Sequence, residues 1–112
     1  MENKILKICE RSEGYKYEGP RYRDLGPFSG QEFREEHLLP WLNSLTDKEK
    51  GIIDFEGTAV YSPSFLEESF GGAIRKNAKN GEKLSNVSFN NIDPIWKEKV
   101  EKYIKLANKS NR

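Results

Sequence analysis

Two carboxylates and two serines lie close together in the middle of this 112-residue chain. Asp54 and Glu56 are two residues apart at the end of a short apolar run, so they share one face of an extended segment. Ser62 and Ser64 follow a few residues later. Paired carboxylates can transfer protons or hold a divalent cation, and a serine becomes a nucleophile when a base activates it. The sequence therefore predicts a candidate charged pocket at Asp54 and Glu56, beside two hydroxyl groups.

A catalytic interpretation of these groups lacks supporting residues. His37 is the one histidine in the sequence, and it falls on the apolar face of a different predicted helix, which favours a structural role. The sequence contains no nucleophile motif, no phosphate-binding glycine loop and no Cys/His spacing typical of a metal site. We therefore expect no catalytic residue, no metal and no cofactor.

The position of these groups depends on a strand that ends at a loop and on a helix that begins after the loop. The apolar run Ile52–Phe55 lies between glycines and predicts a buried strand. Ser62 and Pro63 predict the start of a helix that runs to about Asn77, because serine caps a helix and proline suits its first position. In α/β proteins, the loop between such elements is a common place for function.

Periodic apolar residues predict the other elements. Further strands are expected at Lys4–Glu10, Tyr15–Tyr17 and Leu84–Phe89, and further helices after Ser29 and after Asp93. Pro40 predicts an irregularity near Leu39, and the pair Gly71-Gly72 predicts a close approach of the sheet or of another molecule. The resulting fold is α/β, with a small mixed β-sheet of about four strands covered by three helices in the order ββαβαβα.

Length and composition narrow the class of protein. The length predicts one domain over residues 1–112. Nineteen basic and eighteen acidic residues give a net charge of +1 without a single-sign block, which argues against a nucleic-acid partner and a membrane surface. Cys9 is the one cysteine, and no stretch has the length of a signal peptide or a membrane span. These features predict a cytoplasmic protein.

The residues from Asp54 to Leu66 resemble the centre of STAS domains, the fold of bacterial anti-sigma factor antagonists. Those domains have a strand that ends in Asp-Leu-Ser-Gly, a short loop, and Asp-Ser-Ser at the start of a helix. The chain most resembles the smaller STAS-like family of unknown function found in prokaryotic genomes. The resemblance extends over about residues 50–105 and implies a STAS-like domain.

The resemblance also implies a function without catalysis. It indicates a regulatory module that docks a protein partner, such as a histidine-kinase-like ATPase or a serine kinase, through the loop and helix after the central strand. The residues expected to contact the partner are Tyr61, Ser62, Ser64 and an exposed Glu67–Glu68 pair. In an ungapped overlay, Pro63 takes the place of the serine that partner kinases phosphorylate in STAS domains. Phosphorylation would therefore need Ser64 or Ser62 instead.

Two other classes of function remain open at this stage. A small hydrolase built on Asp54, a serine and His37 would need His37 within hydrogen-bond reach of that serine. A nucleic-acid-binding domain would need its basic side chains on one face together with Arg21 and Arg23. The basic residues concerned are Arg75, Lys76, Lys79 and Lys83. The sequence also leaves a homo-oligomer open.

Overall fold

The sheet of the protein consists of parallel strands. The computed structural model describes residues 2–58 and 62–110, and in this part of the chain it contains three strands in the order β1-β2-β3. The strands are β1 (Glu2–Lys7), β2 (Glu49–Asp54) and β3 (Ser88–Asn90). In register, Ile5 lies opposite Ile52, and Ile53 lies opposite Phe89. The central strand of the sheet is thus the one that the sequence predicted at Ile52–Phe55.

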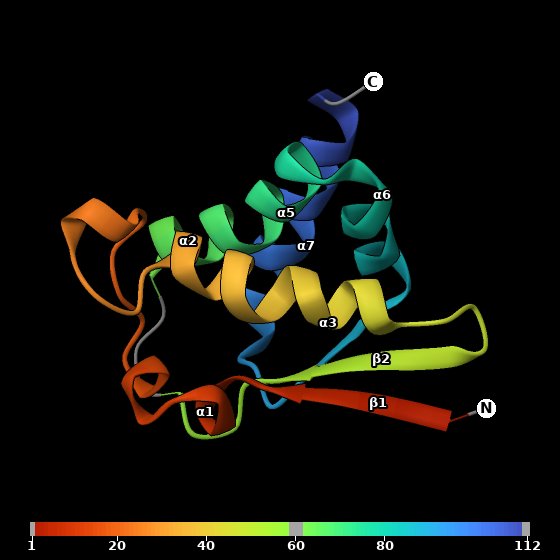
Figure 1. Cartoon of the computed structure of the whole chain (residues 1–112), viewed down its shortest axis with the longest axis horizontal. Helices are drawn as coiled ribbons and strands as arrows, with labels where there is room; N and C mark the ends of the chain where they lie inside the picture. The colour runs from red at the N-terminus through yellow and green to blue at the C-terminus, as the bar shows by residue number, and fades with distance from the viewer. Residues whose placement is uncertain (1, 59–61, 111–112) are drawn as a thin grey trace.

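Helical segments connect the strands (Figure 1). Between β1 and β2 they are α1 (Ile8–Arg11), η1 (Glu13–Lys16), η2 (Arg23–Leu25), α2 (Gly30–Phe33), η3 (Arg34–Leu38) and α3 (Leu39–Ser44). Between β2 and β3 they are α4 (Pro63–Leu66), η4 (Glu67–Gly71), α5 (Gly72–Lys76), α6 (Ala78–Gly81) and η5 (Glu82–Asn86). The last helix is α7 (Pro94–Ser110). Residues 30–44 wind as one helix, the α2–α3 helix, and residues 63–76 wind as another, the α4–α5 helix.

Side-chain caps fix where the long helices begin. The Ser29 hydroxyl accepts a hydrogen bond from the Glu32 N–H at 3.0 Å, and the Ser62 hydroxyl accepts one from the Phe65 N–H at 3.3 Å. Each cap satisfies a backbone donor that has no partner inside its helix. The starts predicted at Ser29 and Ser62 are therefore confirmed.

The irregularity predicted near Leu39 takes the form of a π-helical turn. In η3 the Leu39 N–H donates to the Arg34 carbonyl, five residues earlier, before α-helical geometry resumes. Pro40 cannot donate a backbone hydrogen bond, and its ring crowds the preceding turn. A wider turn at this point gives the ring room without ending the helix.

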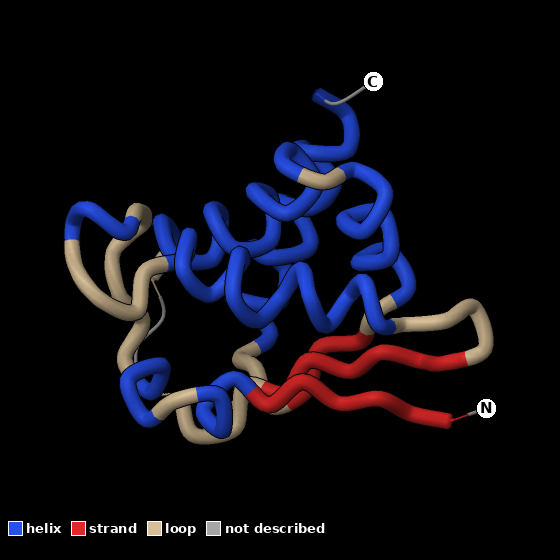
Figure 2. Tube along the Cα trace, in the orientation of Figure 1, coloured by secondary structure: helices blue, strands red, loops and turns tan. Residues whose placement is uncertain are grey.

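The helices gather on one face of the sheet (Figure 2), and the core lies between these two layers. Leu6 and Ile53 point to the helices and are fully buried, whereas Ile5 on the opposite face is 49% exposed. On α7, Val100, Ile104 and Ala107 are buried, as their spacing predicted. The aromatic residues of α7, Trp96 and Tyr103, pack against the core but are only partly buried.

The sequence-based expectation of a mixed sheet of four strands is wrong for the described residues. In the predicted strand at Tyr15–Tyr17, Tyr15 and Lys16 belong to the 3₁₀ turn η1 and Tyr17 forms an isolated β-bridge, while the three observed strands all run parallel. Tyr15 is buried against the rings of Phe28, Phe33 and His37. That aromatic packing, which three alternating residues could not reveal, determines the local conformation.

Two of the predicted strands are also shorter than expected. β1 ends at Lys7, since α1 begins at Ile8, and the residues from Leu84 to Asn86 belong to η5, so β3 begins at Ser88. No helix within residues 2–58 and 62–110 combines the length and the apolar composition that crossing a membrane requires.

We predict that Phe70→Ala lowers the free energy of unfolding by about 3–5 kcal/mol, the usual effect of removing a buried aromatic side chain. Phe70 is fully buried, and its ring contacts those of Phe55 and Phe89 at centroid distances of 6.2 and 5.6 Å. Urea unfolding followed by circular dichroism measures the loss. Leu106→Ala is the control, because Leu106 is exposed and its truncation should change stability by less than about 0.5 kcal/mol. Equal effects of the two changes would contradict this description of the core.

Candidate functional site

Asp54 joins two loops at the carboxyl edge of the sheet. Its Oδ1 accepts hydrogen bonds from the Glu56 N–H at 2.9 Å and from the Asn91 Nδ2 at 2.8 Å. Asp54 is buried, whereas Glu56 is exposed. The carboxylate of Asp54 thus holds the turn after β2 against the loop after β3, which is a structural role. The described residues contain no group of three or more His, Cys, Asp or Glu side chains that could hold a metal ion.

The α4–α5 helix begins after the loop that follows β2, and no hydrogen bond joins its serines to Asp54 or Glu56 within the described residues. Ser62 is partly buried and caps the helix, and Ser64 is exposed in the first turn. The Ser62 N–H donates to the Glu18 carboxylate. Tyr61, which the sequence assigned to the partner-binding surface, lies outside the described residues. The two serines are therefore brought together at one helix end, as predicted, but only one of them is open to solvent.

Glu18 is a member of this site that sequence reasoning did not identify. Burial raises its pKa from the ordinary value of 4.5 to about 8, although the hydrogen bond from the Ser62 N–H acts in the opposite direction. Its second oxygen, Oε2, is buried and has no hydrogen-bond partner in the described part of the chain. Nothing in the sequence around Glu18 signals this contact, because its partner is 44 residues away.

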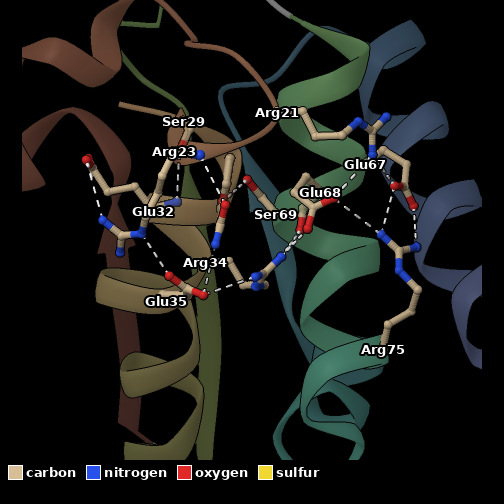
Figure 3. Close-up of polar contacts among 12 residues, drawn as sticks. Arg21, Arg23, Ser29, Glu32, Arg34, Glu35, Glu67, Glu68, Ser69 and Arg75 are labelled. Carbon is tan, nitrogen blue, oxygen red and sulfur yellow. Dashed lines mark hydrogen bonds and ion pairs between the residues drawn. The ribbon is translucent and has the colours of Figure 1, made fainter. Parts of the chain in front are cut away.

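A buried ion pair between Arg34 and Glu68 joins the two long helices (Figure 3). Arg34 is 3% exposed and Glu68 is 5% exposed. The Arg34 Nη1 donates to the Glu68 carboxylate and, at 3.4 Å, to the Glu68 main-chain carbonyl. The Ser69 hydroxyl donates to the Gly30 carbonyl across the same contact. The sequence-based expectation that Glu67 and Glu68 form an exposed pair is therefore wrong for Glu68.

Two glycines make room for this pair. A Cβ at Gly72 would lie 2.7 Å from the Arg34 Nη1, and a Cβ at Gly30 would lie 2.6 Å from the Phe65 carbonyl oxygen. The close approach that Gly71-Gly72 predicted is thus made by the guanidinium of Arg34, from the α2–α3 helix. The sequence offered two candidates for this approach, the sheet and another molecule, and it identified neither the residue nor its helix.

Further ion pairs surround the buried one and attach the loop at residues 19–27 to both helices (Figure 3). The Arg21 Nη1 lies 2.7 Å from Glu67 Oε1 and 3.3 Å from Glu68 Oε1. Arg75, eight residues further along the helix, pairs with Glu67. Its hydrogen bond, followed by that of Arg21, holds the pKa of Glu67 below the ordinary value against the effect of burial. Arg23 pairs with glutamates of η3. Arg21 and Arg23 are thus bound to carboxylates of the protein itself.

The alternatives that the sequence left open have little support in these contacts. The His37 ring packs edge-on against Tyr15, with ring centroids 5.4 Å apart, and burial lowers its pKa. No hydrogen bond joins His37 to a serine in the described residues. The Lys83 ammonium donates to the Leu42 and Leu45 carbonyls at 2.9 Å each, and Arg75 is paired with Glu67. The histidine of the hydrolase hypothesis and two basic residues of the nucleic-acid hypothesis are thus engaged within the fold.

One comparison with known proteins identifies the family of this chain. The family described as a STAS-like domain of unknown function matches residues 29–95, from the Ser29 cap to the start of α7. This match covers more than half of the chain, so the protein belongs to that family. A search of curated proteins and a search of solved structures found no match.

We predict opposite effects of adding a methyl group at the two adjacent glycines. Gly72→Ala should destabilise the protein by about 1–3 kcal/mol, because its Cβ would collide with a guanidinium that is buried and held by Glu68. Gly71→Ala should be neutral or stabilising by up to about 1 kcal/mol, because it gains helix propensity and meets only the flexible ends of the partly exposed Glu67 and Arg75 side chains, which can move aside. Urea unfolding of both variants provides the comparison. A Gly72→Ala variant as stable as Gly71→Ala would show that Arg34 is not fixed there.

A second prediction concerns pH. The folded protein keeps the Glu18 proton up to about pH 8, whereas the unfolded chain loses it near pH 4.5. Between these values the unfolded state binds fewer protons, so the free energy of unfolding should fall as the pH rises through this window. Glu18→Gln should reduce this fall and should exceed the parent in stability at about pH 9.

Urea unfolding at acidic, neutral and alkaline pH measures this effect. Glu56→Gln, the same change at an exposed carboxyl, serves as the control and should retain the slope of the parent. An unchanged slope in Glu18→Gln would show that the carboxyl of Glu18 is hydrated in solution.

Proposed function

We propose that this protein is a non-enzymatic regulatory module that docks a protein partner at the start of the α4–α5 helix. The observation that carries the proposal is the arrangement at Ser62–Ser64. Ser62 is fixed as the cap, whereas Ser64 is presented to solvent in the first turn. Membership of a STAS-like family supports this location, since the resemblance to STAS domains implies a docking surface after the central strand.

The helix that would carry this surface is held rigidly. Phe65, Leu66 and Phe70 on its inner side are fully buried. The buried ion pair between Arg34 and Glu68 fixes the helix laterally. A surface fixed in this way loses little conformational entropy when a partner binds, which favours affinity.

The charge around Ser64 favours an anion at this point. The first turn of a helix presents unpaired N–H groups and a partial positive charge. Glu67 would oppose a phosphate on Ser64, but its charge is already balanced by Arg21 and Arg75. We propose Ser64 as the candidate phosphorylation site, with Ser62 less accessible because its hydroxyl caps the helix. A serine kinase or a histidine-kinase-like ATPase is the class of partner that fits this role.

The proposal also covers the domain organisation, the location and the other classes of partner. The buried apolar cluster takes residues from Leu6 to Ala107, which supports one domain over residues 1–112. A single cysteine in the sequence supports a cytoplasmic location. Membrane and nucleic-acid partners form no part of the proposal, and self-association is one of the outcomes that a binding experiment would reveal.

The test compares Ser64→Asp with Ser64→Ala. A partner captured from the native host and identified by mass spectrometry would be purified, and its affinity for each variant measured by calorimetry. Because Ser62 makes the cap, both variants should fold like the parent. We expect Ser64→Asp to change the affinity about tenfold or more, and Ser64→Ala to change it little. Parental affinity in both variants would place the docking surface elsewhere.

A further inference from the structure

A groove runs between α7 and the α4–α5 helix. It has a volume of about 300 Å³, and its lining residues are Glu67, Arg75, Tyr103, Leu106 and Ala107. This volume is near the lower limit for small-molecule sites, so the groove suits one or two inserted side chains better than a whole ligand. Tyr103 and Leu106 supply apolar surface, and Glu67 and Arg75 form a paired polar wall opposite them.

A row of exposed residues on α7 begins at this groove. Ile95, Lys99, Lys102 and Leu106 are spaced by four, three and four residues, and Leu106 belongs both to the row and to the groove. We call this row the α7 seam. Such spacing places side chains along one line of a helix and is the spacing at which two helices pack together. Ile95 is 66% exposed and Leu106 is 51% exposed, so apolar residues stand in solvent at both ends of the seam.

The α7 seam does not serve the core of the protein. The side of α7 that faces the core is a different one, formed by the buried residues Val100, Ile104 and Ala107. An exposed Ile and Leu are individually unremarkable on a protein surface. Here they recur at helix-packing intervals on one line of α7, which ends at a groove with one apolar wall, and this arrangement is typical of a surface that receives a helix.

The charge of this surface indicates what kind of helix it would receive. α7 carries five lysines and two glutamates. Lys99 and Lys102 occupy the middle of the seam, and none of the ion pairs found within residues 2–58 and 62–110 includes either lysine. Lys99 lies over the Trp96 ring at 5.6 Å, which directs its ammonium along the helix surface. Glu67, the acidic residue that lines the groove, is already bound by Arg75 and Arg21.

We propose that the α7 seam and the adjoining groove dock an amphipathic helix of a partner protein, in which two acidic residues lie between two apolar ones at the same four-three-four spacing. The apolar side chains of that helix would pack against Ile95 and Leu106, with one entering the groove. Its carboxylates would pair with Lys99 and Lys102. This inference deepens the proposed function, on which it rests, because Glu67, which lines the groove, follows Ser64 by three residues on the same helix.

The experiment uses the full chain and a synthetic helical peptide as the probe. The fluorescein-labelled peptide, of about four turns, carries Leu-Glu-Glu-Leu at the stated spacing on an alanine and glutamine background. A twin peptide carries lysine in place of both glutamates. Fluorescence anisotropy should give a Kd on the order of 10–100 μM for the acidic peptide and binding at least about tenfold weaker for the basic twin.

Charge reversal then tests whether the two seam lysines cause the preference for the acidic peptide. Lys99→Glu/Lys102→Glu should reverse the preference, so that the basic twin becomes the tighter ligand. Leu106→Asp should weaken both peptides. The matched control is Lys97→Glu/Lys105→Glu, which makes the same change in charge at exposed positions outside the seam and should keep the parental preference.

Several outcomes would overturn the inference. They are absence of acidic-peptide binding, equal binding of the two peptides, and loss of binding in the control variant. If anionic lipid vesicles or an oligonucleotide bound through the same lysines more tightly than the acidic peptide, the ligand of this surface would be a membrane or a nucleic acid and not a helix. Concentration-dependent dimerisation that Leu106→Asp abolishes would identify a second copy of this chain as the occupant.

The inference and the proposed function can fail separately. The peptide assay needs no cellular partner, so peptide binding with the expected preference supports the helix-binding groove even if the Ser64 variants leave partner affinity unchanged. Conversely, a partner that discriminates Ser64→Asp but is unaffected by Leu106→Asp and by Lys99→Glu/Lys102→Glu would leave the proposed function in place and refute the groove.

Discussion

The buried ion pair between Arg34 and Glu68 is the interaction on which the arrangement of the helices depends. Taking two charges out of water is expensive, and removing one partner of such a pair typically destabilises a protein by about 3–5 kcal/mol. Here the guanidinium also contacts a main-chain carbonyl of the facing helix, which satisfies a further donor. The pair therefore fixes the relative position of the α2–α3 and α4–α5 helices more specifically than apolar contact alone would.

That position has consequences for the backbone around it. Because Gly30 has no side chain, the two helices approach so closely that a Cβ at this position would collide with the Phe65 carbonyl oxygen. Gly72 leaves space for the guanidinium of Arg34. The π-helical turns η3 and η4 begin at Arg34 and Glu67, beside the same contact. Such turns shift the phase of the side chains that follow them. The charged contact, the glycines and the helix irregularities thus form one structural unit.

The same unit determines what the protein presents to solvent. Arg21 and Arg75 extend the ion pairs to the surface and neutralise Glu67, so the acidic residues of the α4–α5 helix are largely satisfied inside the protein. The lysines in the middle of the α7 seam form no ion pair within the described chain, and they lie next to exposed apolar residues. A net charge of +1 therefore conceals an uneven distribution, in which the charges between the two long helices are paired and α7 carries five lysines against two glutamates.

The sequence by itself determined the features that depend on neighbours along the chain. Serine caps, helix-initiating prolines and the apolar run at Ile52–Phe55 specified the central strand and the start of the helix that follows it, and those same residues carried the resemblance to STAS-like domains. These signals are local, because a cap or a buried strand requires particular residues within a few positions. The tertiary structure decided the rest. It placed Tyr15 in an aromatic cluster instead of a strand, buried Glu18 and Glu68, and brought Arg34 to the glycine pair. Each of these outcomes joins residues more than ten positions apart, and the sequence pattern around a charged residue does not indicate whether an opposite charge from a distant helix will reach it.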